Sequence, residues 1–102
     1  MLDADALQDV VSSRHDLLAR VSAGGIRKRD RVDGLGVSRS TVDRSVRELE
    51  RTGLVERRDG KVHLTMTGSI ALGLHDRLLD RFQEVVRAER LLDSLPADAP
   101  PP

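Results

Sequence analysis

The feature that most constrains the fold is a long stretch without helix breakers near the end of the sequence. Thr65 is a suitable N-cap, and from there to Leu95 the chain contains no proline, while Gly68 and Gly73 lie near its start. A helix over about residues 66–95 would be on the order of 42 Å long. Because 102 residues form one domain of modest size, we expect part of this helix to extend beyond the body of that domain.

One side of this predicted helix is apolar at helical spacing. The residues that we expect at an interface there are Leu74, Leu78, Phe82, Val85 and Leu92. Arg81 and Glu89 fall within the same sector, so a seam along the helix would have to accommodate two charges. The length of the helix favours a homodimer interface, and an intramolecular core alone is the alternative.

A second segment, GVSRSTVDRSVRELERTGL, predicts a helix with both ends marked. Ser38 is placed to cap its start, and Gly53 to adopt the left-handed conformation after its end. The buried stripe is predicted to contain Val42, Val46 and Leu49. The opposite face carries Ser40, Arg44, Arg47 and Arg51. A short helix with hydroxyls in its first turn and arginines on its free face suits a DNA major groove.

The next segment, LVERRDGKVHLT, predicts a β-hairpin around Asp59-Gly60, a dipeptide that favours a type I′ turn. With a two-residue loop, the expected cross-strand partners are Val55 with Leu64 and Arg57 with Val62. Arg58 and Lys61 then flank the tip. A basic hairpin tip directly after such a helix is placed to reach phosphates or the minor groove.

The chain before these segments predicts two further helices. An aspartate, Asp3 or Asp5, caps a first helix running to about Ala23. Arg14 falls on its apolar side, so we expect its guanidinium to extend to water or to a carboxylate. A shorter helix is expected over about residues 27–35.

Composition restricts the core and the chemistry. One Phe with no Trp or Tyr implies an aliphatic core, and the absence of cysteine excludes disulfides and thiolate metal sites. The net charge is zero, but residues 26–61 hold eleven basic against seven acidic residues, net +4, and each flank is net −2. Positive charge is thus concentrated around the arginine-bearing helix, which is typical of an electrostatic footprint on nucleic acid.

Other function classes lack support in the sequence. We find no phosphate-cradling glycine loop, paired carboxylates or nucleophile motif, so we expect neither an enzyme nor a cofactor. His15, His63 and His75 are far apart without ligand-like spacing, so we expect no metal site. No apolar run is long enough to span a membrane and no signal peptide is present, so a cytoplasmic protein is expected.

The segment VSRSTVDRSVRELERTGLVERRDGKVHLTMTG resembles the winged helix-turn-helix domains of archaeal and bacterial transcriptional regulators. The similarity is greatest to the N-terminal DNA-binding domain of haloarchaeal MarR-like and ArsR-like regulators, and covers about residues 7–96. It implies a mainly α fold with a small β-hairpin and a long C-terminal helix. We expect one such domain over residues 1–95, with a dimerisation helix at about 66–95 and a proline-rich tail over 96–102.

The resemblance implies base-reading positions at Arg39, Ser40, Thr41 and Arg44, and wing contacts at Arg57, Arg58 and Lys61. With the helix cap and one further arginine, the predicted DNA-binding set is Ser38, Arg39, Ser40, Thr41, Arg44, Arg47, Arg57, Arg58 and Lys61. The predicted function is sequence-specific binding of double-stranded DNA and transcriptional regulation by a homodimeric repressor. The sequence identifies no small-molecule effector.

Two alternatives stay open. The arginines of the helix would also suit a solvated face with Asp43–Arg47 and Arg44–Glu48 ion pairs, and the hairpin cations a solubilised edge. At the level of function, the alternative is a winged-helix protein-interaction module that does not bind DNA. The near-neutral charge and the acidic flanks favour that alternative.

Overall fold

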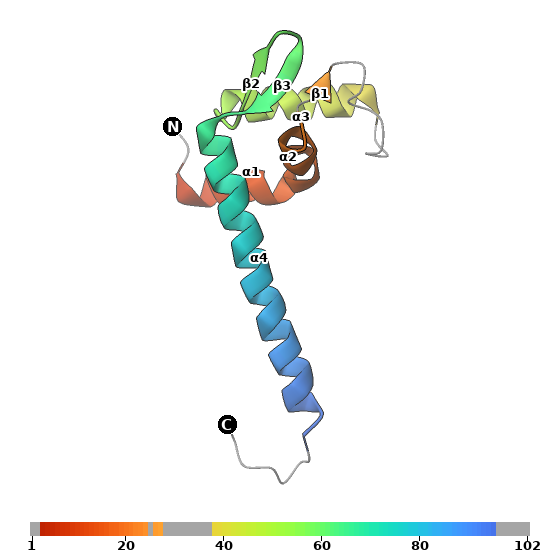
Figure 1. Ribbon diagram of the computed structural model, residues 1–102, viewed down its shortest axis with the longest axis vertical. Coiled ribbons are helices and arrows are strands. Elements are labelled where there is room, and N and C mark those ends of the chain that lie inside the picture. The colour runs from red at the N-terminus through yellow and green to blue at the C-terminus, as the bar shows by residue number, and fades with distance from the viewer. Residues whose placement is uncertain (1–2, 25, 28–37, 96–102) are drawn as a thin grey trace.

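The computed structural model describes residues 3–24, 26–27 and 38–95. Its helices are α1 (Ala4–Ser13), α2 (His15–Ser22), α3 (Arg39–Arg51) and α4 (Met66–Asp93). Its strands are β1 (Ile26–Arg27), β2 (Val55–Arg58) and β3 (Lys61–Leu64). Figure 1 shows the first three helices and the sheet gathered into one body, from which α4 projects. The predicted mainly helical fold with a hairpin and a long C-terminal helix is confirmed.

Two predicted segments lie wholly or largely outside the described residues. The proline-rich tail over residues 96–102 lies outside the described residues, as does nearly all of the helix predicted over 27–35. The prediction is wrong for Arg27, the described first residue of that helix, because Ile26–Arg27 is a strand. It pairs with β3, placing Ile26 opposite Val62, in a sheet of order β1-β3-β2. A two-residue strand carries no alternating pattern, so only its non-local pairing defines it.

The first helix begins as predicted, with the Asp3 side chain accepting the Ala6 N–H at 2.8 Å. The prediction of one helix to about Ala23 is wrong, because the chain leaves helical geometry at Arg14 (φ −112°, ψ 19°) and α2 starts anew. Two serines with modest helix propensity precede this break. The break also directs Arg14 toward α3.

The Arg14 guanidinium meets a carboxylate, as its place on an apolar side predicted. Its Nη2 donates to Oε2 of Glu48 on α3 at 3.0 Å, and both side chains are about one-third exposed. An ion pair at this exposure contributes on the order of 1 kcal/mol. This pair therefore fixes α3 against the junction of α1 and α2.

The hairpin has the predicted register. Val55 pairs with Leu64 and Arg57 with Val62. Asp59 and Gly60 have φ values of 52° and 75°, and these two consecutive positive values are what a type I′ turn requires. The geometry of the turn therefore matches the right-handed twist of the two strands.

The core is aliphatic, as the composition required. The predicted stripe of α3 is confirmed, since Val42, Val46 and Leu49 are at most 2% exposed. They pack with residues of α1, α2, the turn after α3, the sheet and α4: Val11, Leu17, Leu18, Val21, Leu54, Val55, Val62 and Leu72. Full burial of one such side chain contributes about 1.5–3 kcal/mol, so this face of α3 is committed to the core. On its other face, Arg44, Arg47 and Arg51 are exposed.

The end of α3 is closed by a Schellman motif. Gly53 has a φ of 79° and donates to the Glu50 carbonyl at 3.1 Å, and the Leu54 N–H donates to the Leu49 carbonyl at 3.0 Å. The side chains of Leu49 and Leu54 are both fully buried. This motif reverses the chain so that β2 can begin at once.

The same turn holds the start of α4. The Leu54 carbonyl accepts the Thr65 N–H at 3.0 Å, and the Thr65 hydroxyl donates to the Gly53 carbonyl at 2.6 Å while accepting the Gly68 N–H at 3.1 Å. A Cβ placed on Gly68 would lie only 2.0 Å from the Leu54 oxygen. The absence of a side chain at this position permits the contact.

We predict that Gly68→Ala destabilises the fold by about 3 kcal/mol, because the methyl group meets backbone that is anchored in the core. Urea unfolding followed by circular dichroism measures the change. Gly73→Ala is the matched control, since its nearest neighbour is the Arg77 side chain at 3.5 Å. It should stabilise α4 by about 0.5–1 kcal/mol. Equal stability of Gly68→Ala and the wild type would contradict the tight packing.

Candidate nucleic-acid interface

The first turn of α3 is organised by Ser38. Its Oγ accepts the Thr41 N–H at 3.2 Å and lies 2.8 Å from the Thr41 hydroxyl, so the predicted N-cap is confirmed. Arg39, Ser40 and Thr41 are all exposed, and the turn contains no acidic residue. Backbone N–H groups and the helix dipole make this end positive, and Arg39 adds to that charge. An anion is the complement of such an end.

The exposed face of α3 is cationic. Arg44, Arg47 and Arg51 are exposed and line one open surface concavity of about 430 Å³, together with Glu50. Across residues 3–24, 26–27 and 38–95, neither Arg44 nor Arg47 lies within ion-pair distance of a carboxylate. Of the two local pairs in the alternative interpretation, Arg44–Glu48 is not formed, because Glu48 pairs with Arg14.

The reason is visible at Glu48, the expected partner of Arg44. Its carboxylate binds Arg14 instead, because the break before α2 brings that guanidinium to α3. The pair forms between elements rather than along the helix, and leaves Arg44 facing solvent.

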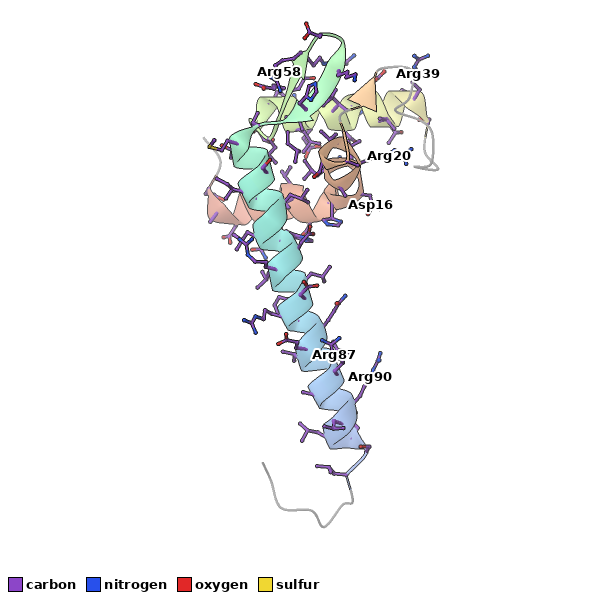
Figure 2. The ribbon with its side chains drawn as sticks, viewed as in Figure 1. Asp16, Arg20, Arg39, Arg58, Arg87 and Arg90 are labelled. Carbon is purple, nitrogen blue, oxygen red and sulfur yellow. The ribbon has the colours of Figure 1, made fainter. Side chains whose placement is uncertain are left out.

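The hairpin arginines are held by acidic side chains. Arg57 Nε lies 2.9 Å from Oε1 of Glu50 on α3, and Arg58 Nε lies 3.1 Å from Oε1 of Glu56 on the same strand. Such exposed pairs contribute about 0–1 kcal/mol, so an incoming phosphate can replace the carboxylate at little cost. Figure 2 shows Arg39 and Arg58 on the side of the body remote from the free end of α4.

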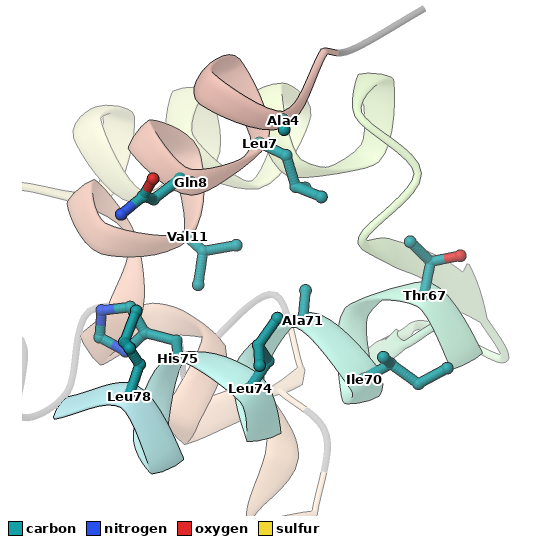
Figure 3. Close-up of a pocket in the computed structure, with 10 residues that line it drawn as sticks. All are labelled: Ala4, Leu7, Gln8, Val11, Thr67, Ile70, Ala71, Leu74, His75 and Leu78. Atoms are coloured by element: carbon teal, nitrogen blue, oxygen red, sulfur yellow. The ribbon is translucent and has the colours of Figure 1, made fainter. Parts of the chain in front are cut away.

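The five predicted interface residues of α4 are all exposed, between 42% and 62%: Leu74, Leu78, Phe82, Val85 and Leu92. The N-terminal part of this row, Leu74 and Leu78, borders an apolar groove of about 450 Å³ between α4 and α1 (Figure 3). The α1 side of the groove includes Ala4, Leu7 and Val11. These α1 residues were absent from the predicted interface, because periodicity within one helix does not reveal which helix it lies against.

A cluster of ionisable groups joins α2 to α4. His15 Nε2 lies 2.7 Å from Asp76 Oδ1, and the His15 and His75 rings have centroids 4.8 Å apart. The pKa of the Asp76 carboxyl lies below its ordinary value, mainly because of this hydrogen bond with His15. Desolvation of the carboxyl acts in the opposite direction. Sequence spacing predicted no grouping of these histidines, and tertiary packing alone brings them together.

These elements define a small, mainly helical domain in which an arginine-bearing helix precedes a basic hairpin. The chain belongs to the HVO_A0261 N-terminal domain family, whose family model matches residues 3–90. That match spans every described strand and all helices except the last residues of α4. Comparison with curated proteins and with solved structures found no match. Among the described helices, none combines the length and the apolar character needed to cross a bilayer.

We predict that Ser38→Ala destabilises the protein by about 1 kcal/mol, because the Thr41 N–H loses its acceptor. Thermal or urea unfolding gives the difference. Ser38→Asp is the control, since aspartate keeps a capping oxygen and should retain stability close to that of the wild type. An alanine variant as stable as the aspartate variant would argue against the cap.

Proposed function

We propose that this protein is a winged helix-turn-helix regulator that binds double-stranded DNA sequence-specifically and represses transcription as a homodimer. In this proposal α3 is the recognition helix and the β2–β3 hairpin is the wing. The observation that carries it is the exposed arginine face of α3, on which Arg44 and Arg47 lack an ion pair among the described residues. Grouping like charges opposes folding, so such a face is better accounted for by an anionic partner.

The chemistry of the first turn supports DNA as that partner. Arg39, Ser40 and Thr41 are exposed at the N-terminal end of α3, the part of a recognition helix that contacts base edges. Arginine forms paired hydrogen bonds with guanine, and hydroxyls bind bases or phosphates. Arg57, Arg58 and Lys61 extend the cationic surface over the hairpin.

The uncovered side of α4 supports the homodimer. Its apolar row is exposed along most of the helix, and the groove beside α1 continues that row. A second copy of α4 packed about a twofold axis would bury both, because each protomer presents the same surface to the other. Two recognition helices would then contact half-sites about 34 Å apart on a palindromic operator.

The direct test selects duplexes from a random pool and measures binding by fluorescence anisotropy across a salt series. We predict that Arg44→Ala and Arg47→Ala each weaken binding by about tenfold, and that losing a phosphate contact lowers the salt slope by about one. Arg87→Ala is the control, because Arg87 is exposed on the distal half of α4 (Figure 2). A folded dimer that fails to bind at low salt would favour the protein-interaction module instead.

A second prediction uses the Arg57–Glu50 pair. Glu50→Gln should strengthen DNA binding by about fivefold at low salt, because it frees Arg57 and removes a negative charge beside the α3 arginines. The control is Glu84→Gln, which removes the same charge from the Arg81–Glu84 pair of α4. Anisotropy with the selected duplex compares the two. Equal effects would show that only net charge matters.

A third prediction concerns the dimer. Phe82→Arg should weaken self-association at least about tenfold, because it places a charge in the apolar row. Gln83→Arg adds the same charge next to it, outside that row, and should leave the dimer intact. Light scattering over a concentration series distinguishes the two variants. If both stay dimeric, the interface lies elsewhere.

A further inference from the structure

We propose that His15, His75 and Asp76 form a binding site for a divalent transition-metal ion of the zinc class between α2 and α4. One ring nitrogen from each histidine and one oxygen of Asp76 lie within 4.8 Å of one another. This site is separate from the DNA-binding surface, and neither proposal requires the other.

The donor atoms already face one another. Asp76 Oδ1 lies 2.7 Å from His15 Nε2 and 3.7 Å from His75 Nδ1. A tetrahedral site with bonds of about 2.0–2.1 Å needs donors about 3.3 Å apart, so the longest separation must shorten by about 1.5 Å. Asp76 Oδ1 accounts for the two shorter separations, so the longest one lies between the two imidazoles, and rotation of the His15 and His75 rings would close it.

His75 supplies the second observation. Its Nδ1 is inaccessible to solvent and has no hydrogen-bond partner, although buried ring nitrogens are ordinarily paired. Figure 3 shows the ring at the end of the apolar groove, beside Gln8 and Leu78. A neutral imidazole with its lone pair on this atom is a ready ligand, and a bound cation would satisfy it.

The environment of His15 also fits a metal ligand. While Nε2 faces Asp76, the other ring nitrogen, Nδ1, lies 3.7 Å from the Asp16 carboxylate. Metal-bound histidines commonly direct their second nitrogen toward such an outer carboxylate, which orients the ring. The 3.7 Å separation is longer than a hydrogen bond, and a small rotation of exposed Asp16 closes it.

The donor set selects the class of ion. Two imidazoles and one carboxylate suit Zn²⁺, Ni²⁺ or Co²⁺, whereas Mg²⁺ and Ca²⁺ prefer oxygen donors alone. Three protein ligands leave a fourth position for water. A bound ion would replace the single His15–Asp76 hydrogen bond and fasten α2 to α4.

The test uses the full chain without a histidine tag, stripped of metal with EDTA. Isothermal titration with ZnCl₂ should give one ion per chain, and Co²⁺ should give the visible absorption of a four- or five-coordinate site. His75→Gln and Asp76→Asn should each weaken Zn²⁺ binding at least about tenfold. His63→Gln is the matched control, since His63 is the remaining histidine and lies on β3.

The proposal is overturned if the folded wild-type chain binds no Zn²⁺, or if His75→Gln and Asp76→Asn both bind it like the wild type. Equal loss of binding in His63→Gln would also overturn it, by indicating adventitious coordination. Circular dichroism verifies that each variant is folded. No DNA is present in these measurements, so their outcome is independent of the proposed DNA binding.

Discussion

The close backbone contact between Gly68 and the carbonyl of Leu54 determines how the parts of this protein are joined. Leu54 is fully buried, ends the turn after α3 and accepts a hydrogen bond from Thr65. One residue therefore connects the arginine-bearing helix, the hairpin and the start of α4. Because this contact is made of backbone and core atoms, the direction in which α4 leaves the body is fixed, although most of the described residues of α4 are exposed.

The distribution of ion pairs follows from the same packing. Glu48 and Glu50 lie on α3 among arginines, yet their carboxylates bind Arg14 and Arg57, which come from other elements. Those pairs fasten α3 to its neighbours and leave Arg44 and Arg47 facing solvent. A chain of zero net charge thus presents a locally cationic face, which accords with a role in binding a polyanion.

Local chemistry made much of the fold predictable. The cap at Ser38, the left-handed Gly53 and the Asp59-Gly60 turn depend on groups within a few residues of one another, and all three are confirmed. Strand β1 and the histidine cluster depend on contacts between distant segments, and the sequence pattern predicted neither of them nor the break at Arg14. The candidate site shows the same contrast between local and distant interactions. The exposed arginine face of α3 was predictable from the sequence, but the pairing of Glu48 with Arg14 instead of Arg44 was not.

Because α4 is anchored near its N-terminal end, a small rotation there would displace its distal end by a larger distance. Beyond its first turns, the helix is a rod with about 38 Å between Gly68 and Asp93 at its usual rise. A rotation of about 5° at the base would move the far end by about 3 Å, so the position of the distal residues of α4 depends on the packing around Gly68. The His15–Asp76 contact, eight residues further along α4, restrains that rotation.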